Sequence, residues 1–218
     1  MRNPCRLSQR YFFISTFNDK VYEAEEKMKV VAFNGSARKD GNTAVLLKRV
    51  LSVLESEGIE TELIQLAGET IHGCTACRAC FETKNQRCAI TDDNVNAYIQ
   101  KMLEADGILL GSPTYFGMMS PELKALIDRA GFVCRATPDA LKFKVGAAVA
   151  VARRAGAMTT FDAINHFFLI NQMIVSGSSY WNIGMANKKG EIEKDEEALK
   201  TMDDLGKNMT WLIKKLKV

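Results

Sequence analysis

The stretch KVVAFNGSARKDGNTAVLLKRVLSVL, residues 29–54, holds the pattern that decides the fold. Its first part, Lys29–Phe33, is a short apolar run of β-prone residues, which favours a strand. A polar turn with two glycines follows, and Thr43–Leu54 then carries apolar residues at helical spacing: Leu47, Val50, Leu51 and Leu54. A strand that enters a helix through a polar turn is the opening unit of an α/β fold.

The same alternation of strands and helices continues along the rest of the chain. Further strands are expected at Thr61–Leu66, Gly107–Gly111, Val145–Val151 and from Ile174 onward. Further helices are expected after Asp92 or Asp93, at Pro121–Ala130, at Ala157–Ile170 and at about 194–216. Such alternation requires parallel strands joined by right-handed crossovers, and the unbroken apolar run 145–151 suits a sheet covered on both faces. The sequence therefore predicts a three-layer, doubly wound, five-stranded parallel sheet in the order 2-1-3-4-5.

The composition limits the domain count and the classes of partner. The 218 residues are 47% hydrophobic and 25% charged, which fits one domain with one sizeable core. The net charge of +3 gives no electrostatic reason to bind nucleic acid or a membrane surface. No apolar run approaches the roughly 18–20 residues that cross a bilayer. We expect a single domain over residues 28–218 with a cysteine-rich loop at 72–88.

Residues 1–27 form a segment unlike the rest of the chain, because they are polar and irregular and run directly into Met28. One hypothesis is that Met28 is a natural start and that residues 1–27 are an extension. The alternative is an ordered extension that packs on a partner subunit.

Four of the six cysteines lie within fifteen positions. The apolar run at 11–17 contains Ser15 and Thr16, and no small-residue cleavage site follows it. A secreted disulfide framework is therefore not expected. We expect a reducing, cytoplasmic protein in which the cysteine cluster serves metal or redox chemistry.

The first polar turn follows a strand and opens a helix, which is where free backbone N–H groups and the helix dipole bind an anion. Gly35 and Gly41 let the backbone turn closely, and the candidate ligands of a phosphate monoester are Ser36, Arg38, Asn42 and Thr43. Neither GxxxxGK[ST] nor GxGxxG is present here, which disfavours an ATPase or a dinucleotide site. The alternative is an ordinary polar turn with Thr43 as a helix cap.

Two further turns leave strands at the same edge of the expected sheet. The turn GSPTYFGMMSP, residues 111–121, supplies flat apolar surface from Tyr115 and Phe116, which suits a planar ring; the alternative is aromatic packing in the core. In the turn at 152–157, Gly156 and its neighbours present N–H groups to the polar edge of a ring, and Arg154 presents positive charge to a ring or a phosphate. The alternative for this turn is an exposed basic loop.

The cysteine cluster has the spacing C-x2-C-x2-C-x7-C, at Cys74, Cys77, Cys80 and Cys88. Three closely spaced thiolates suit a cuboidal iron–sulfur cluster, whereas structural zinc usually takes two separated pairs. Free thiols, a disulfide and zinc stay open as alternatives. Elsewhere, the adjacent Asp128 and Arg129 are expected to form a pair at a helix end rather than a catalytic pair.

Taken together, the three turns resemble those of the flavodoxin-like NADPH-dependent FMN reductase family, over about residues 29–215. The matching motifs are Gly35-Ser36-Ala37-Arg38 with Gly41-Asn42-Thr43, Ser112-Pro113-Thr114-Tyr115-Phe116-Gly117, and Pro121-Glu122-Leu123-Lys124-Ala125-Leu126-Ile127-Asp128-Arg129. The resemblance implies FMN with its phosphate at Ser36, Arg38, Asn42 and Thr43. It also implies that the isoalloxazine ring lies along Pro113, Thr114, Tyr115, Phe116 and Gly117. Ala155-Gly156-Ala157 departs from the adjacent glycines of many relatives.

Within that family, the compact cysteine spacing resembles that of the iron–sulfur flavoproteins, which implies a 4Fe–4S cluster near FMN. The resemblance also implies a homodimer or homotetramer, with NAD(P)H or a ferredoxin-like protein as electron donor. The leading hypothesis is an FMN-dependent oxidoreductase with a flavin, quinone-like or iron–sulfur acceptor, for which no catalytic acid–base side chain is assigned. The alternatives are a non-enzymatic electron carrier or redox sensor, and a zinc-stabilised interaction module.

Overall fold

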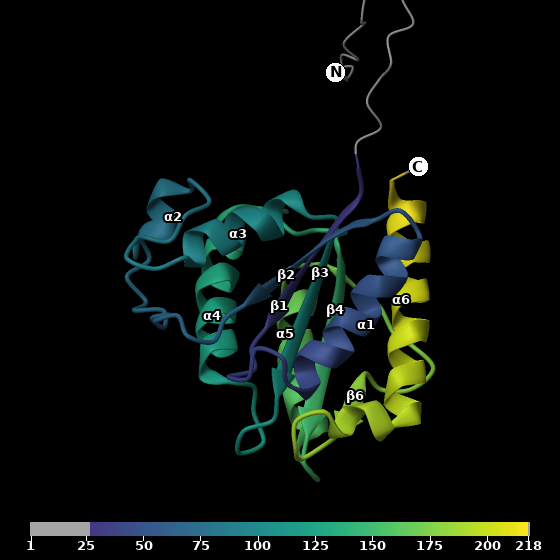
Figure 1. Cartoon of the computed structure of the whole chain (residues 1–218). Helices are drawn as coiled ribbons and strands as arrows, with labels where there is room; N and C mark the ends of the chain where they lie inside the picture. The colour runs from purple at the N-terminus through teal and green to yellow at the C-terminus, as the bar shows by residue number, and fades with distance from the viewer. Residues whose placement is uncertain (1–26, 218) are drawn as a thin grey trace, which may run out of the picture.

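A computed structural model describes residues 27–217, and within that range six strands form one parallel sheet with helices on both faces (Figure 1). The expected N-terminal extension, apart from Lys27, lies outside the described residues. The strands are β1 (Lys29–Asn34), β2 (Glu60–Gln65), β3 (Gly107–Pro113), β4 (Val145–Ala152), β5 (Ile174–Val175) and β6 (Ile183–Met185).

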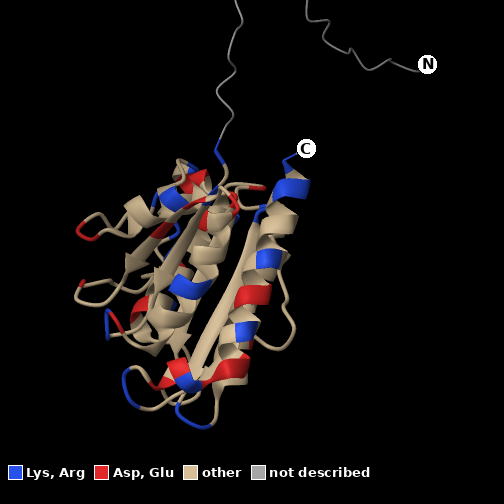
Figure 2. Ribbon diagram, turned by 45° about the vertical axis from the view of Figure 1, so that its right-hand side comes forward, with Lys and Arg blue, Asp and Glu red and all other residues tan. Residues whose placement is uncertain are grey.

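The helices form the two outer layers. They are α1 (Asn42–Ser56), α2 (Ala79–Thr83), α3 (Val95–Glu104), α4 (Pro121–Ala136), α5 (Ala157–Ile170), the 3₁₀ helix η1 (Glu191–Lys194) and α6 (Glu196–Leu216). One apolar core lies between the sheet and α3, α4 and α5, and a second lies between the sheet and α1 and α6. Figure 2 shows that α6 carries charges of both signs along its length, as expected for the solvated face of an outer helix. Among the helices within residues 27–217, none combines the length and the apolar character that a membrane crossing requires.

The strand order β2-β1-β3-β4-β5 confirms the predicted doubly wound sheet. The fifth position, however, is occupied by two short strands instead of one. β5 pairs with β4 at Val145 and Gly146, and β6 pairs with β4 at 150–152. Between them lies Ser176-Gly-Ser-Ser179, whose serines and glycine have low strand propensity, so the chain leaves the sheet and returns to it.

The cysteine segment was expected to be a loop, and it contains the short helix α2. Arg78 and Lys84, which flank this helix, both have left-handed backbone conformations, with φ of 60° and 49°. These two turns fold the segment back on itself beside α4. Figure 1 shows the segment projecting from the sheet on the side of α3 and α4.

Helices α1 and α6 pack closely at a glycine. An added Cβ at Gly206 would lie 2.7 Å from Cβ of Val53 and 3.1 Å from the carbonyl oxygen of Val50. The oxygen of Val50 is a backbone atom, and Cβ of Val53 is bonded directly to the backbone. Neither atom can move aside without a shift of the helix. Gly131, in the interior of α4, is less crowded, because an added Cβ there would have its nearest contact at 3.8 Å, with Phe167.

We expect Gly206→Ala and Gly131→Ala to have opposite effects on stability. Alanine favours a helix over glycine, so Gly131→Ala raises the free energy of unfolding by about 0.5–1 kcal/mol. At Gly206 the overlap with Val53 outweighs this gain, and the free energy of unfolding falls by about 1–3 kcal/mol. Urea denaturation of both variants measures the difference, and equal effects would contradict the close packing of α1 on α6.

Candidate functional site

The turn between β1 and α1 is held from within by polar side chains. The backbone N–H of Ser36 donates to Asn34 Oδ1 at 3.0 Å, and the N–H of Arg38 donates to Ser36 Oγ at 3.1 Å. Gln65, at the end of β2, donates from Nε2 to the carbonyl oxygen of Ser36 at 2.7 Å. The turn therefore has a defined shape, and it leads into the first turn of α1, where helical N–H groups lack intrahelical partners.

The turns after β1 and β3 pack directly against each other. The N–H of Gly35 donates to the carbonyl oxygen of Gly111 at 2.8 Å, and a Cβ on Gly35 would lie 2.8 Å from Ser120 Oγ. A glycine at 35 is what permits this close approach. Residues of both turns line one cavity of about 200 Å³: Ser36, Arg38, Asn42, Thr43, Pro113, Thr114 and Tyr115.

The tip of the second turn is a tight hairpin. Tyr115 and Met118 exchange backbone hydrogen bonds of 2.8 and 3.0 Å. Phe116 and Gly117, between them, have φ of 50° and 78°, the left-handed pair of a type I′ turn. Phe116 is fully exposed at this tip, whereas Tyr115 contributes to the cavity. The base of the turn is closed where the N–H of Ser120 donates to Ser112 Oγ at 2.9 Å.

Thr114 supplies the observation that points most directly to a ligand. Its Oγ1 is buried, and it has no hydrogen-bond partner among the described residues. A buried hydroxyl without a partner is costly, so a polar ligand atom in the cavity that Thr114 lines would be stabilising. The N-terminus of α1 and the two cations of the cavity, Arg38 and Arg153, favour an anionic group in the same ligand. The residues present therefore fit FMN.

The third turn also contributes to the cavity. Arg153 lines the cavity, whereas Arg154 is exposed and is not part of its lining. Gly156 has a φ of 85°, and a Cβ there would lie 3.2 Å from Cα of Gly117. The third turn thus packs on the second one. The assignment of Arg154 and Gly156 to cofactor binding stays a prediction.

Asn42 uses its side chain for a structural contact. Its Nδ2 donates to the carbonyl oxygen of Lys188 at 2.9 Å, and its Oδ1 accepts from the N–H of Gly190 at 2.9 Å. The amide therefore joins α1 to the segment after β6, which brings Ala186 and Asn187 to the cavity. Sequence reasoning missed these two residues, because nothing local in the sequence links positions so far apart.

The four clustered cysteines line one small hollow of about 20 Å³, together with Arg129. None of the four forms a disulfide with another described cysteine, and burial raises the pKa of the Cys80 thiol. Among residues 27–217 there is no group of three His, Cys, Asp or Glu side chains that could hold a single metal ion. In a cuboidal cluster each thiolate binds a different iron, so the sulfurs need not converge on one point. Four cysteines around one hollow fit this donor set.

Arg129 is a further residue whose place beside the cysteines sequence reasoning missed. The expected pairing of Asp128 with Arg129 is wrong, because Asp128 pairs with Lys124 at 2.6 Å and Arg129 pairs with Asp93. Arg129 is 1% exposed. Burial opposes the charge of Arg129, but hydrogen bonds to Asp93 and Cys88 raise its pKa. Burial likewise opposes the charge of Asp93, yet hydrogen bonds from Arg129 and backbone amides lower its pKa.

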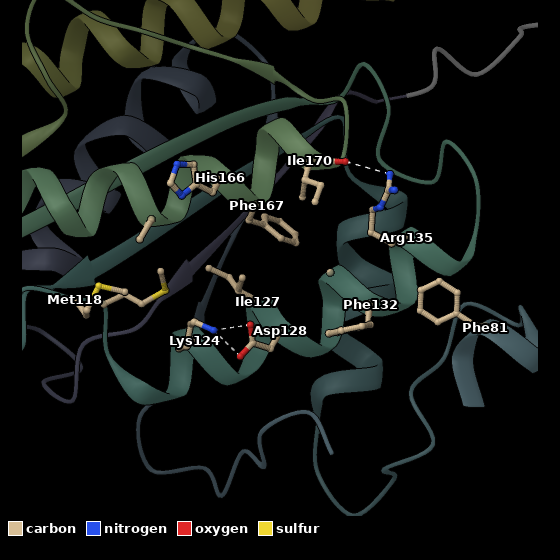
Figure 3. A pocket seen from close by; sticks show the side chains of 13 residues that line it. Phe81, Met118, Lys124, Ile127, Asp128, Phe132, Arg135, His166, Phe167 and Ile170 are labelled. Carbon is tan, nitrogen blue, oxygen red and sulfur yellow. Dashed lines mark hydrogen bonds and ion pairs between the residues drawn. The ribbon is translucent and has the colours of Figure 1, made fainter. Parts of the chain in front are cut away.

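A larger apolar groove of about 590 Å³ lies between α4 and α5. Figure 3 shows Met118, from the second turn, at one end and Phe81, from the cysteine segment, at the other. Phe132 and Phe167 lie between these ends. The groove therefore runs between the hairpin turn after β3 and the cysteine segment.

Comparison with known proteins agrees with these features. The family model of NADPH-dependent FMN reductase matches residues 28–188. The chain is 41% identical over 202 residues to an iron–sulfur flavoprotein of Methanocaldococcus jannaschii, covering 87% of this chain and 100% of the relative. It is 34% identical over 186 residues to an iron–sulfur flavoprotein of Methanosarcina thermophila, covering 82% and 95%.

A solved flavodoxin from the domain Archaea shares the fold, with a TM-score of 0.56 and 17% identity over 86% of this chain and 99% of that one. The region that the family model matches contains the turn between β1 and α1, the hairpin turn after β3 and the cysteine segment. The chain therefore belongs to the iron–sulfur flavoproteins within the NADPH-dependent FMN reductase family.

Proposed function

We propose that this flavoprotein is an FMN-dependent oxidoreductase. It moves electrons between NAD(P)H or a protein donor, such as a ferredoxin-like protein, and a flavin, quinone-like or iron–sulfur acceptor. The observation that carries the proposal is the cavity that Thr114 lines together with the N-terminal residues of α1 and two arginines; the buried hydroxyl of Thr114 has no hydrogen-bond partner among the described residues. FMN supplies hydride acceptance and one-electron transfer when bound, and an iron–sulfur cluster supplies one-electron transfer.

The residues of the first turn offer the phosphate different kinds of contact. Ser36 and Thr43 are buried and offer hydroxyls, and Arg38 offers charge from the exposed part of the turn. Asn42 contributes through its backbone N–H, because its amide is already bonded to Lys188 and Gly190. The first helical turn of α1 thus supplies donors that need no rearrangement when an anion binds.

The second turn is assigned to the isoalloxazine ring. Pro113 and Thr114 are half-buried at the cavity wall, and Tyr115 offers an aromatic face beside them. The hairpin bonds between Tyr115 and Met118 hold this wall in place. Phe116 extends from the tip into solvent, so in this chain alone it covers no part of the cavity.

We further propose that Cys74, Cys77, Cys80 and Cys88 hold a 4Fe–4S cluster. Their shared hollow supports this, as do the names of the relatives at 41% and 34% identity. A homodimer or homotetramer and a cytoplasmic location stay predictions.

Those same relatives' names state two kinds of redox centre and no enzymatic activity, so the second candidate function is that of an electron carrier or redox sensor without significant NAD(P)H turnover.

Steady-state kinetics separates the two candidates. We expect the FMN-loaded protein to oxidise NAD(P)H anaerobically when free FMN or a quinone is the acceptor, and the nicotinamide absorbance measures the rate. The FMN-free protein is the control. Negligible oxidation, together with rapid reduction of the protein by a reduced ferredoxin, would favour the carrier.

The phosphate site is tested by comparing FMN with riboflavin. We expect Arg38→Ala to weaken FMN binding about tenfold, because one charge-assisted contact to the phosphate is lost at a partly solvated position. Riboflavin has no phosphate, so its affinity stays unchanged. Flavin fluorescence quenching measures both constants, and Lys48→Ala, at an exposed lysine paired with Asp40, is the control. An equal loss for both ligands would contradict the assignment.

The cluster is tested at its most distant cysteine. We expect Cys88→Ala to lose most of its iron after anaerobic reconstitution, because one iron then lacks its thiolate. Cys134→Ala is the matched control, since Cys134 is a buried residue of α4 and burial raises the pKa of its thiol to about 12. Iron and sulfide analysis measures loading. Full iron content in Cys88→Ala would remove Cys88 from the ligand set.

A further inference from the structure

The two ends of the cysteine segment meet at one buried guanidinium. Arg129 donates from Nη1 to the carbonyl oxygen of His72 at 3.3 Å and from Nη2 to that of Ile90 at 2.9 Å. His72 precedes Cys74, and Ile90 follows Cys88. A single side chain of α4 therefore closes the segment that carries all four clustered cysteines.

The same guanidinium reaches a cysteine sulfur. Nε of Arg129 donates to Cys88 Sγ at 3.3 Å. The backbone of Cys88 is held separately, because its N–H donates to Asn96 Oδ1 at 2.7 Å and its carbonyl oxygen accepts from Asn96 Nδ2 at 3.0 Å. Cys88 is thus fixed at its backbone by α3 and at its sulfur by α4, whereas Cys77 is exposed.

The buried charge beside Cys88 is a balance between one cation, Arg129, and one anion, Asp93, whereas Arg78, which lines the same hollow, is exposed. Asp93 Oδ2 accepts from Arg129 Nη1 and from the N–H of His72, and the side chains of Arg129 and Asp93 are 0% and 2% exposed. At this burial the field of each group is weakly screened by water. Removing either partner leaves the other charge uncompensated next to the sulfur.

We propose that Arg129 is the positioning residue of Cys88 and that its balance with Asp93 sets the reduction potential of the cluster. The inference rests on the proposed 4Fe–4S cluster. An N–H donor and a positive charge at a ligating sulfur stabilise the reduced, more negative cluster, so Arg129 raises the potential. Asp93 opposes part of this effect through its negative charge.

Anaerobic redox titration of the reconstituted full-length protein, followed by absorbance and electron paramagnetic resonance, tests the proposal. We expect Arg129→Met to shift the cluster potential to more negative values and Asp93→Asn to shift it to more positive values. Arg129→Lys keeps the charge but loses the planar fork, so its potential lies between those of the wild type and Arg129→Met. Arg135→Met, on the same helix, is the control with an unchanged potential.

A merely structural role of Arg129 and Asp93 does not shift the cluster potential in opposite directions in Arg129→Met and Asp93→Asn. If Arg129→Met and Asp93→Asn load iron normally and shift the potential in the same direction, or not at all, the inference is overturned. A wild type that binds no iron after reconstitution overturns the proposed cluster, and the inference falls with it.

Hydrogen exchange of the iron-free protein tests positioning where a variant loads no iron. We expect Arg129→Met to speed amide exchange in residues 72–93 about tenfold, since the hydrogen bonds that close the segment are lost, and to leave β1 and β3 unchanged. Such a variant, folded but loose in this segment and without iron, supports the proposal. Unchanged exchange in residues 72–93 contradicts it.

Discussion

The parallel pairing of β1 with β3 is the constraint on which the cavity depends. Its register sets Asn34 beside Gly111, and the next bond, from Gly35 to the carbonyl oxygen of Gly111, brings the two following turns into contact. A parallel sheet places the carboxyl ends of adjacent strands at one edge, so the turns after β1 and β3, from distant parts of the sequence, share one cavity. Any larger residue at Gly35 would separate them.

Hydropathy periodicity was sufficient to predict the layers, because each buried strand and helix carries its own local signal, as in Val145–Val151 and in the helix that begins at Pro121. It failed where local propensity is weak. The serines and glycine at 176–179 interrupt the last strand, and the two-residue strand before them is too short for a period of two to be read.

The polar contacts around the site were less accessible to sequence reasoning. Arg129 and Asp128 are neighbours in the sequence, but they point to different partners, because successive helical residues face directions about 100° apart. The hydrogen-bond partners of Arg129 at His72 and Cys88 lie 57 and 41 residues earlier in the chain, so no local pattern indicates its burial. Asn42 has the same property, since it contacts Lys188 and Gly190.

Helix α4 touches both the hairpin turn and the cysteine segment, and this sets the distance between their points of attachment. Its N-cap, Ser120, is bonded to Ser112 at the base of the hairpin turn, and Arg129, nine positions later, holds the cysteine segment. At 1.5 Å of rise per residue, these two attachment points are separated by about 13 Å along the helix axis. The distance between these attachment points is therefore set by a single helix, and movement of either loop leaves that distance unchanged.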